Sequence, residues 1–346
     1  MNDRPDGPVS GPAVWKGAYY RDDDSWVHVL TEAEISDIER ALDALAPQAL
    51  REARFEQSDF PLAELGPALE EILAQVQEGR GFALIRGLPL DRWSRQQIDA
   101  AYWGIGAYLG APISQNAQGH LIAEVTDRGH SYATSVNDRG YRSRDALNPH
   151  VDTSDITALL CLRPAKSGGH SSIASSLAIY NDILAHHPDH MDRLLAGYHH
   201  DLRGEGPSGK LDEVTHNRIP VFSSHEGRLS CCYNDKIIRS AHDKMGEPLA
   251  PEDEAALRCV LETAHRSDIR LDMWLERGDI QLINNYVLLH WRTAFEDFVE
   301  ADKRRCLLRL WLNTHEPRPL AADFADRYNT GPRGGVWVDE ANAVSL

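Results

Sequence analysis

From about residue 112 onward, the chain consists of short apolar or β-branched runs separated by turns rich in Gly, Asn, Asp and Pro. Such runs predict short strands, and a long series of them is typical of a barrel or jelly roll rather than a parallel α/β sheet. The expected strands span residues 121–125, 156–162, 219–222, 269–275, 280–283 and 306–312. Helices are expected as insertions at about 176–186, 189–196 and 252–265. We therefore expect a mainly β core with flanking helices.

The preceding part of the chain, residues 26–111, carries helix signals instead. Capping boxes, in which Ser or Thr is followed three residues later by Glu or Gln, begin at Thr31 and Ser94, and each precedes a helical apolar pattern. Another helix is expected to begin at Pro67, because proline is favoured in the first turn, and to end near Gly79. A buried strand is expected at about residues 82–86, so this part is expected to be rich in helix.

The domain organisation follows from composition along the chain. Residues 1–25 mix Pro, Gly, Asp and Ser with little periodicity, which predicts a flexible N-terminal arm. No internal repeat, low-complexity tract or clean linker divides the remainder. We expect residues 26–346 to form a single domain with three parts. These are the helix-rich part 26–111, the barrel with its insertions 112–315, and a C-terminal extension 316–346.

Charge and cysteine content limit the partners and the compartment. The chain has 36 basic and 53 acidic residues, a net charge of −17, and such a chain repels the phosphate backbone of nucleic acids. Its five cysteines form no CxxC pair, so we expect reduced thiols. The longest apolar runs are strand-sized, and the first residues lack the order of a signal peptide. We expect a soluble cytoplasmic protein that binds neither nucleic acid nor membrane, and a homo-oligomer stays open.

The segment His150-Val151-Asp152 is a candidate metal-binding pair. On a strand alternate side chains share a face, so His150 and Asp152 point to the same side. The signal is weak alone, because the chain has 16 histidines and a solvated or core-packed pair is the alternative. His290, which ends an apolar run after an Asn-Asn turn, is the best third ligand. Two imidazoles and one carboxylate form the triad that binds Fe(II) with open positions. Zinc normally takes a more closed tetrahedron, and a core histidine is the alternative for His290.

The run from Arg304 to Leu312 supports an anion site nearby. On a strand Arg305 and Arg309 share one face, whereas Cys306, Leu308, Leu310 and Leu312 build an apolar face on the other side. A partly enclosed guanidinium needs an anionic partner, because removing it from water is costly. That partner is either a protein carboxylate in an internal salt bridge or a bound ligand.

In combination these motifs are similar to those of a known family. His150 and Asp152 come first, Gly168-Gly169-His170-Ser171 follows, then the distant His290, and finally arginines 15 and 19 residues beyond it. This order, over roughly residues 80–313, resembles the taurine dioxygenase and clavaminate synthase-like family of Fe(II)/2-oxoglutarate-dependent oxygenases. The resemblance implies a double-stranded β-helix, a cupin-like jelly roll, with a helical insertion between the proximal and distal metal ligands.

The resemblance also implies roles for individual residues. His150, Asp152 and His290 correspond to the iron ligands, and Arg305 to the arginine that binds the distal carboxylate of 2-oxoglutarate. Ser171 corresponds to a hydroxyl residue that helps to hold this co-substrate. Arg309 corresponds to a second arginine, near either the substrate or the co-substrate carboxylate.

Two departures from the family pattern count against taurine as the substrate. The threonine that usually follows the Gly-Gly pair is Ser171 here, and Ile283-Asn284-Asn285-Tyr286 replaces a Trp-Asp-Asn-Arg segment before the distal histidine. Both changes leave the iron ligands intact.

The resemblance implies an O₂-consuming oxidoreductase that converts 2-oxoglutarate to succinate and CO₂. Hydroxylation of a small carboxylic acid, such as a free amino acid, is the expected outcome, and desaturation or cyclisation are alternatives from the same chemistry. A zinc-dependent hydrolase and a catalytically silent β-helix binding protein are the other readings of the same residues. Candidate substrate-binding residues are Gln115, Asn116, Asn148, Tyr233, Arg239 and Arg309.

Overall fold

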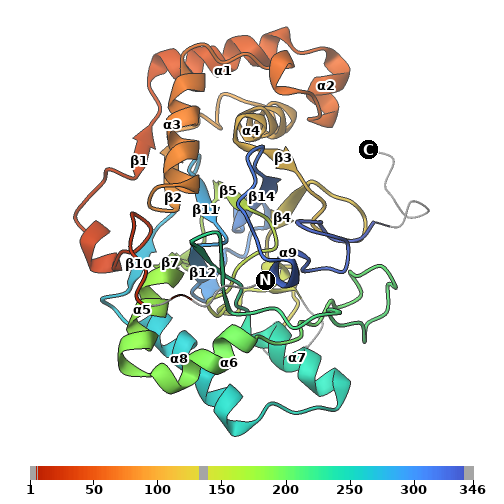
Figure 1. Cartoon of the computed structure of the whole chain (residues 1–346). Coiled ribbons are helices and arrows are strands. Elements are labelled where there is room, and N and C mark those ends of the chain that lie inside the picture. The colour runs from red at the N-terminus through yellow and green to blue at the C-terminus, as the bar shows by residue number, and fades with distance from the viewer. Residues whose placement is uncertain (1–4, 6, 132–138, 339–346) are drawn as a thin grey trace.

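A computed structural model describes residues 5, 7–131 and 139–338, and its centre is a large, mostly antiparallel sheet (Figure 1). The strand order is β1-β2-β11-β5-β14-β3, with β4 also paired to β14. The bounds are β1 Val27–Val29, β2 Phe82–Arg86, β3 Ala111–Pro112, β4 Ile122–Val125, β5 Ile156–Arg163, β11 Ile280–Asn284 and β14 Cys306–Asn313. Among the strand pairs of this sheet in the described residues, only β1–β2 is parallel. The sheet therefore brings together segments that lie far apart in the sequence.

A smaller antiparallel sheet carries the rest of the core. Its order is β10-β7-β12, from β10 (Arg270–Met273), β7 (Ser171–Ser175) and β12 (Leu288–Arg292). Two further antiparallel pairs join β6 (Ser167–Gly168) to β13 (Phe295–Glu296) and β8 (Phe222–His225) to β9 (Arg228–Cys231). Buried apolar side chains of both sheets, such as Leu307 and Ile173, belong to one continuous core. The strands therefore form the expected jelly-roll core.

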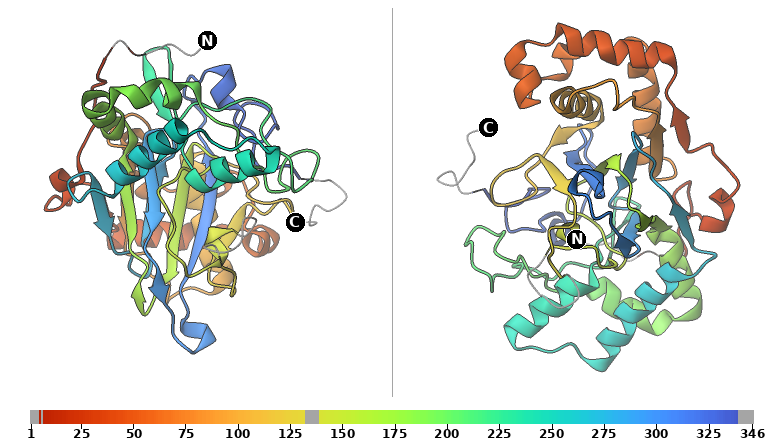
Figure 2. Two further views of the ribbon diagram at one scale, coloured as in Figure 1. Left: turned by 90° about the horizontal axis from the view of Figure 1, so that it is seen from below. Right: turned by 180° about the vertical axis from the view of Figure 1, so that it is seen from behind.

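Helices cover the strands on two sides (Figures 1 and 2). The N-terminal helices are α1 Glu32–Ala44, α2 Pro47–Glu52, α3 Leu65–Gln77 and α4 Arg95–Leu109. Those between His150 and His290 are α5 Ser176–His186, α6 Met191–Ala196, α7 Asp235–Met245 and α8 Pro251–His265. A short α9 (Ala322–Ala325) lies in the C-terminal part, and 3-10 turns lie at Gly17–Tyr20, Gln57–Asp59, Gly140–Arg142, Pro188–His190 and Ala301–Lys303. The helical insertion between the two candidate histidines is confirmed.

Strand β14 shows how the alternating pattern builds the fold. Cys306, Leu308, Leu310 and Leu312 pack in the core shared with α1, α3 and α4, as the apolar face predicts. The odd-numbered residues Leu307, Arg309 and Trp311 line the pocket on the other side of the sheet. Arg305, which comes just before the strand, lines the same pocket and so continues the odd-numbered face.

Some expected elements differ in their bounds. The strand expected at residues 219–222 begins only at Phe222, because Pro220 has no N–H to donate to a ladder and Ile219 forms just an isolated bridge. Helix α7 and the serine-rich strand β7 were not expected, since Ser-Ser-Ile-Ala-Ser lacks the β-branched pattern of a strand. The capping boxes at Thr31 and Ser94 are confirmed by reciprocal hydrogen bonds.

The N-terminal segment packs against the body of the molecule from Val9 onward. The Val9 N–H donates to Asn181 Oδ1 at 2.8 Å, and Trp15 is only 6% exposed and donates to the Arg80 carbonyl oxygen. This part is packed rather than a loose arm, because Ala13 and Trp15 bury apolar side chains; residues 1–4 and 6 lie outside the described part.

All five cysteines are buried free thiols, as expected. Among the helices of the described residues, none has the length and apolar character needed to span a bilayer.

Candidate metal centre

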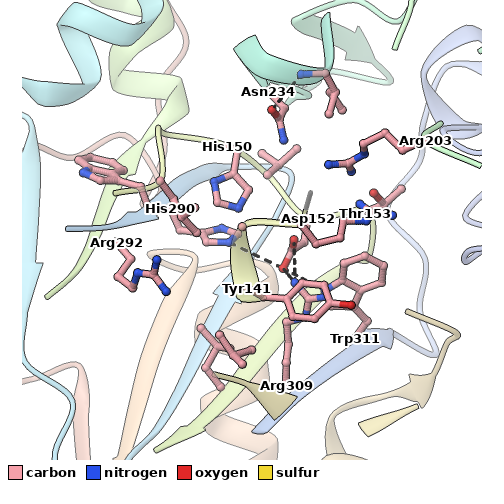
Figure 3. Close-up of a pocket in the computed structure, with 18 of the residues that line it drawn as sticks. Tyr141, His150, Asp152, Thr153, Arg203, Asn234, His290, Arg292, Arg309 and Trp311 are labelled. Atoms are coloured by element: carbon pink, nitrogen blue, oxygen red, sulfur yellow. Dashed lines mark hydrogen bonds and ion pairs between the residues drawn. The ribbon is translucent and has the colours of Figure 1, made fainter. Parts of the chain in front are cut away.

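A pocket lies between the two sheets (Figure 3). Leu159 and Leu307 line it from the larger sheet, and Ser171, His290 and Arg292 line it from the smaller one. Loops before β5 and in the helical insertion complete its walls. The pocket therefore collects side chains from segments that only the folded sheets bring together.

Backbone pairing holds His150 and His290 side by side. Each amide N–H donates to the other residue's carbonyl oxygen, at 3.0 and 2.9 Å, and the ring centroids are 4.4 Å apart. His150 Nδ1 lies 2.8 Å from the Asn148 carbonyl oxygen, which can only accept, so Nδ1 carries the proton and Nε2 keeps its lone pair. His290 Nδ1 is buried without a hydrogen-bond partner, and its Nε2 lies 3.7 Å from Asp152 Oδ2.

The carboxylate of Asp152 is fixed by several donors. Its Oδ2 accepts hydrogen bonds from the Trp311 indole N–H at 2.9 Å and the Thr157 hydroxyl at 3.0 Å. Arg309 Nη1 lies 3.4 Å from Oδ1. Figure 3 shows the carboxylate held between these donors and the His290 imidazole.

The ionisation of the three side chains suits a cation. Burial alone would raise the pKa of Asp152, but the charges of Arg309, His290 and His150 and the Trp311 hydrogen bond outweigh it and hold the pKa below its usual range. Burial lowers the pKa of His290 to about 3, with His150 adding to the effect, and burial also lowers the pKa of His150. Near neutral pH the centre therefore offers one carboxylate and two neutral imidazoles.

This donor set fits a divalent transition metal. The ligand atoms of His150, Asp152 and His290 all lie within 4.8 Å of one another. Two imidazoles and one carboxylate are the ligand set of non-haem Fe(II) oxygenases and leave room for further ligands. In the described part of the chain, one other group meets the same distance condition, and it consists of His187, His190 and Cys259 near the outer helices. Only the first group lies in the pocket.

The same pocket contains a buried guanidinium that suits a carboxylate ligand. Arg305 is 6% exposed, and its Nη1 is buried without a hydrogen-bond partner. Arg292 lies beside it, and both guanidinium groups stack on the Phe295 ring, at 5.1 and 4.6 Å from its centroid. Burial lowers the pKa of Arg305 to about 10, and burial with the neighbouring Arg305 lowers the pKa of Arg292 to about 9. Both still carry charge at neutral pH, and an anion would relieve the cost of their burial.

Ser171 and Arg309 also line this pocket. The Ser171 hydroxyl donates to Gln281 Oε1 at 2.9 Å. Arg309 Nε donates to Gln115 Oε1 at 2.7 Å, and its guanidinium lies 4.4 Å from the Trp311 ring centroid. Gln115 therefore orients Arg309 from behind and is not among the lining residues.

The other candidate substrate residues lie outside the pocket lining. Asn116 organises its own loop through His120, and exposed Asn148 contributes its carbonyl oxygen to His150. Tyr233 is fully buried and donates to the Leu257 carbonyl oxygen. Arg239 pairs with Asp235 and Glu254 on the helical insertion.

Several pocket residues were missed from the sequence. Tyr141, Arg139, Arg203, Asn234 and Arg327 line the pocket from loops, and Arg292 lines it from β12. Of these, only Arg292 had a usable signal, because on a strand it must share the face of His290 two residues earlier.

Asn285 supports the centre from behind. This fully buried residue follows β11; its Oδ1 accepts the Asp152 N–H at 3.0 Å, and its Nδ2 donates to Thr157 Oγ1 at 2.9 Å and Ser154 Oγ at 3.2 Å. The Asn-Asn segment thus fixes both the backbone and the hydroxyl partner of Asp152.

We expect Asn285→Ala to weaken iron binding by roughly 10- to 100-fold, the usual effect of losing an outer partner of a metal ligand. Fe(II) titration under anaerobic conditions measures this affinity. Asn284→Ala is the matched control, because the Asn284 amide donates to the Val76 carbonyl oxygen away from the centre. Equal iron affinity in Asn285→Ala and the wild type would contradict this role.

The pH dependence of stability should report the buried His200. Burial, with Arg327 as the next cause, lowers the pKa of His200 to about 3, whereas an unfolded histidine titrates near 6.5. Between these values the unfolded chain binds the extra proton, so stability falls as the pH falls below about 6.5. At pH 5 this histidine should cost about 2 kcal/mol relative to pH 7.

Urea unfolding of metal-free protein at pH 7 and pH 5, with His200→Gln as the comparison, measures this difference. We expect the variant to lose about 2 kcal/mol less than the wild type over this range. The same pH dependence in both proteins would contradict the account of His200.

Comparisons with known proteins agree with this geometry. The family model described as "Taurine catabolism dioxygenase TauD, TfdA family" matches residues 43–311. FR-33289 synthase of Streptomyces rubellomurinus is 33% identical over 324 residues, which cover 92% of this chain and 94% of that protein.

Two solved structures share the fold. Asparagine oxygenase, in complex with Fe(II), 2S,3S-3-hydroxyasparagine and succinate, has a TM-score of 0.64 at 19% identity, covering 84% of this chain and 94% of that one. The non-heme iron oxygenase OrfP, in complex with Fe and alpha-ketoglutaric acid, has a TM-score of 0.58 at 17% identity, covering 85% and 99%. The expectation of a jelly-roll core is confirmed by these neighbours.

The family match covers most of the chain, and the described pocket holds the donor set that this chemistry needs. The chain belongs to the taurine catabolism dioxygenase TauD, TfdA family and is a non-haem Fe(II)/2-oxoglutarate-dependent dioxygenase.

Proposed function

We propose that His150, Asp152 and His290 bind the Fe(II) of this dioxygenase and that Arg305 binds the carboxylate of 2-oxoglutarate remote from the metal. One observation carries the proposal. Three metal-binding side chains with ligand atoms within 4.8 Å of one another share a pocket with a buried guanidinium whose Nη1 has no protein partner.

The surrounding residues orient these groups. The Asn148 carbonyl oxygen keeps the proton of His150 on Nδ1 and so leaves Nε2 for the metal. Trp311 and Thr157 hold the Asp152 carboxylate in place. The carboxylate of 2-oxoglutarate would form a charge-assisted, bidentate pair with Arg305.

We propose that Ser171 and Arg292 help Arg305 to bind the 2-oxoglutarate carboxylate. Ser171 presents its hydroxyl from β7, opposite Arg292 in the strand register. Arg309 contacts Asp152 and is oriented by Gln115, so it can serve an acidic group of either the substrate or the co-substrate.

When bound, Fe(II), 2-oxoglutarate and O₂ supply an oxidant that removes hydrogen from a substrate C–H bond as 2-oxoglutarate becomes succinate and CO₂. The protein orients the target carbon and keeps stray reductants and bulk water away. We propose hydroxylation as the outcome, with desaturation or cyclisation as alternatives from the same chemistry.

We propose a small acid as the substrate, in the class of free amino acids and short carboxylates. The arginine-rich pocket supports an acidic group. The asparagine oxygenase structure contains hydroxyasparagine, and another OrfP structure contains (3S)-hydroxy-L-Arg. Uridine-5'-phosphate dioxygenase of a Streptomyces species, 24% identical over 226 residues, is named for an acidic substrate of another kind.

Two further proposals concern the whole chain. We propose that residues 26–346 form one domain, which the cores shared between helices and sheets support, although residues 339–346 lie outside the described part. A cytoplasmic location is supported by the five buried free thiols.

The function is tested by assaying Fe(II)-dependent release of succinate from 2-oxoglutarate, first without substrate and then with a panel of small acids. We expect slow release with iron, ascorbate and O₂ alone, none with Zn²⁺ in place of iron, and faster release with the right acid. Tightly held zinc with hydrolytic activity would favour a zinc-dependent hydrolase. The absence of both metal and turnover would favour a catalytically silent binding protein.

A further inference from the structure

One wall of the pocket is built from arginines that the iron and 2-oxoglutarate sites do not use. Arg139, Arg203 and Arg327 come from three separate segments, namely the loop before the proximal histidine, the helical insertion and the C-terminal part. In Figure 3 Arg203 lies on the far side of the metal-binding triad from Arg292. This wall is therefore distinct from the end of the pocket that holds Arg292.

Arg203 has no carboxylate partner among the described residues. Its Nε is buried without a hydrogen-bond partner, and its backbone N–H donates to Asp201 Oδ1 at 2.8 Å. Its φ of 54° lies in the left-handed region, which is uncommon for a residue other than glycine. The chain holds this guanidinium in the pocket without neutralising it.

Arg327 is likewise a buried arginine whose charge no carboxylate neutralises in the described residues. It is 7% exposed, its Nη1 donates to the Asp152 carbonyl oxygen at 3.2 Å, and its Nη2 is buried without a partner. The rings of Tyr286 and Phe324 lie 4.9 and 4.8 Å from its guanidinium carbon and hold it in place. In the described ranges no carboxylate pairs with it, so this buried charge is also uncompensated.

The carboxylates nearby are already engaged. Glu205 forms an ion pair with Arg139, and Asp201 accepts from Lys244 at 2.8 Å and from the Ser240 hydroxyl. Neither is free to neutralise Arg203 or Arg327.

The arginines are close enough to affect the same neighbours. After burial, Arg327 and Arg203 contribute to the low pKa of His200, and Arg203 is the next cause after burial of the low pKa of Arg139. His200 is 4% exposed and its Nε2 is also buried without a partner. Buried like charges of this kind are costly unless an anion joins them. Arg203, Arg327 and His200 all line the same pocket, so an anion bound at this wall lies among them.

The number of charges and donors indicates which anion fits. Arg203 and Arg327 leave two positive charges, each on a planar group that binds oxygen pairs. A monocarboxylate brings one negative charge and two oxygens, whereas a phosphate-type group brings up to about two negative charges and three strong acceptor oxygens. The match in charge and in acceptors favours the phosphorus oxyanion.

We infer that the substrate carries a phosphonate or phosphate-monoester group that binds Arg203 and Arg327, an inference that rests on the proposed function of the iron centre. Arg327 also touches the backbone of Asp152, so the oxyanion lies beside a metal ligand. The oxidised carbon is therefore close to the phosphorus-bearing end of the substrate. The small acid proposed above is, on this basis, a phosphorus acid.

The inference is tested by calorimetric titration of methylphosphonate, and separately of methyl phosphate, into the anaerobic Fe(II) enzyme saturated with 2-oxoglutarate. Saturation fills the Arg305 site, so the probe cannot bind there. We expect saturable binding of at least one probe, weakened about thirtyfold or more by Arg203→Gln, the usual effect of removing one partner of a buried charge pair. Arg92→Gln, an exposed arginine paired with Glu32, loses the same charge and should bind the probe like the wild type.

Arg203→Lys and Arg327→Gln extend the test, and thermal unfolding confirms that each variant is folded. We expect intermediate affinity in the lysine variant, because it keeps the charge but loses the planar pair of donors. Equal affinity in Arg203→Gln and Arg92→Gln, or no binding of either probe by the folded wild type, would overturn the inference.

Turnover separates this inference from the proposed function. Alkylphosphonates, phosphate monoesters and carboxylates of matched carbon skeleton are compared for the succinate release that they stimulate above the substrate-free rate. We expect a phosphorus acid to stimulate release in the wild type and in Arg92→Gln but not in Arg203→Gln. Stimulation by a carboxylate alone, unchanged in Arg203→Gln, would overturn the inference while leaving the iron site in place. Loss of iron-dependent release from the wild type would instead contradict the proposed function.

Discussion

Replacing Asp152 by alanine should leave a folded protein that retains no iron at the pocket and releases no detectable succinate. The carboxylate is the only anionic member of the triad, and it is also the group that balances Arg309 and accepts from Trp311. Without it, two neutral imidazoles face a buried guanidinium, and that environment repels a cation. His150→Ala and His290→Ala should have the same effect. Metal content per chain and succinate release together measure the loss.

His186→Ala is the matched control for the histidine variants, because His186 is exposed at the end of α5. It should keep wild-type iron and turnover. Asp152→Asn is a second variant that preserves the shape of the side chain, so loss of iron there cannot be assigned to a cavity. Normal activity in Asp152→Ala would discard the proposed ligand set.

Replacing Arg305 by alanine should mainly raise the requirement for 2-oxoglutarate. Truncating one partner of a buried, hydrogen-bonded charge pair typically costs 2–5 kcal/mol, so we expect the KM for 2-oxoglutarate to rise roughly a hundredfold or more. Arg305→Lys should recover part of this loss, because it restores the charge without the planar pair of donors. Steady-state succinate release at varied 2-oxoglutarate measures the KM, while iron content should be unchanged.

Arg304→Ala is the neighbouring control. Arg304 is exposed and its side chain donates to the Val299 carbonyl oxygen at 3.2 Å, so its truncation should leave the KM for 2-oxoglutarate unchanged. Equal KM values in Arg305→Ala and Arg304→Ala would contradict the assignment of Arg305.

The strand that carries Arg309 shows what could be predicted from the sequence. Its strict alternation places Leu308 and Leu310 in the helix-covered core and Arg309 and Trp311 in the pocket, because successive side chains of a strand alternate between faces. The rule does not extend to His150 and Asp152, because His150 forms only isolated bridges and Asp152 lies outside any strand. Period and spacing are local properties, and they sufficed to predict a jelly roll, whereas the proposed ligand set also needed the resemblance to a known family.

The outer wall of the pocket depends on contacts that no local pattern records. Arg139, Arg203 and Arg327 are single arginines in irregular segments, and only the packed insertion and the C-terminal part bring them to one place. Conversely, the sequence suggested Tyr233 and Arg239 as substrate-binding residues. In the structure Tyr233 is buried in the core, and Arg239 pairs with carboxylates of the helical insertion.

The contacts of the Asn284-Asn285 segment could not be predicted from the local sequence either. The sequence shows it only as a departure from the family pattern. In the structure Asn285 binds the backbone of Asp152 and the hydroxyl of Thr157, while Asn284 binds the backbone at the end of α3. Which partner a buried amide finds is decided by tertiary packing, so its supporting role became visible only in the fold.

The most direct test of the account is anomalous scattering at the iron edge from crystals grown anaerobically with Fe(II) and 2-oxoglutarate. We predict a strong peak in the pocket within bonding distance of His150 Nε2, Asp152 and His290, with a 2-oxoglutarate carboxylate on the Arg305 guanidinium. Iron bound elsewhere, or His290 turned away from His150 and Asp152 in the metal-bound enzyme, would contradict it.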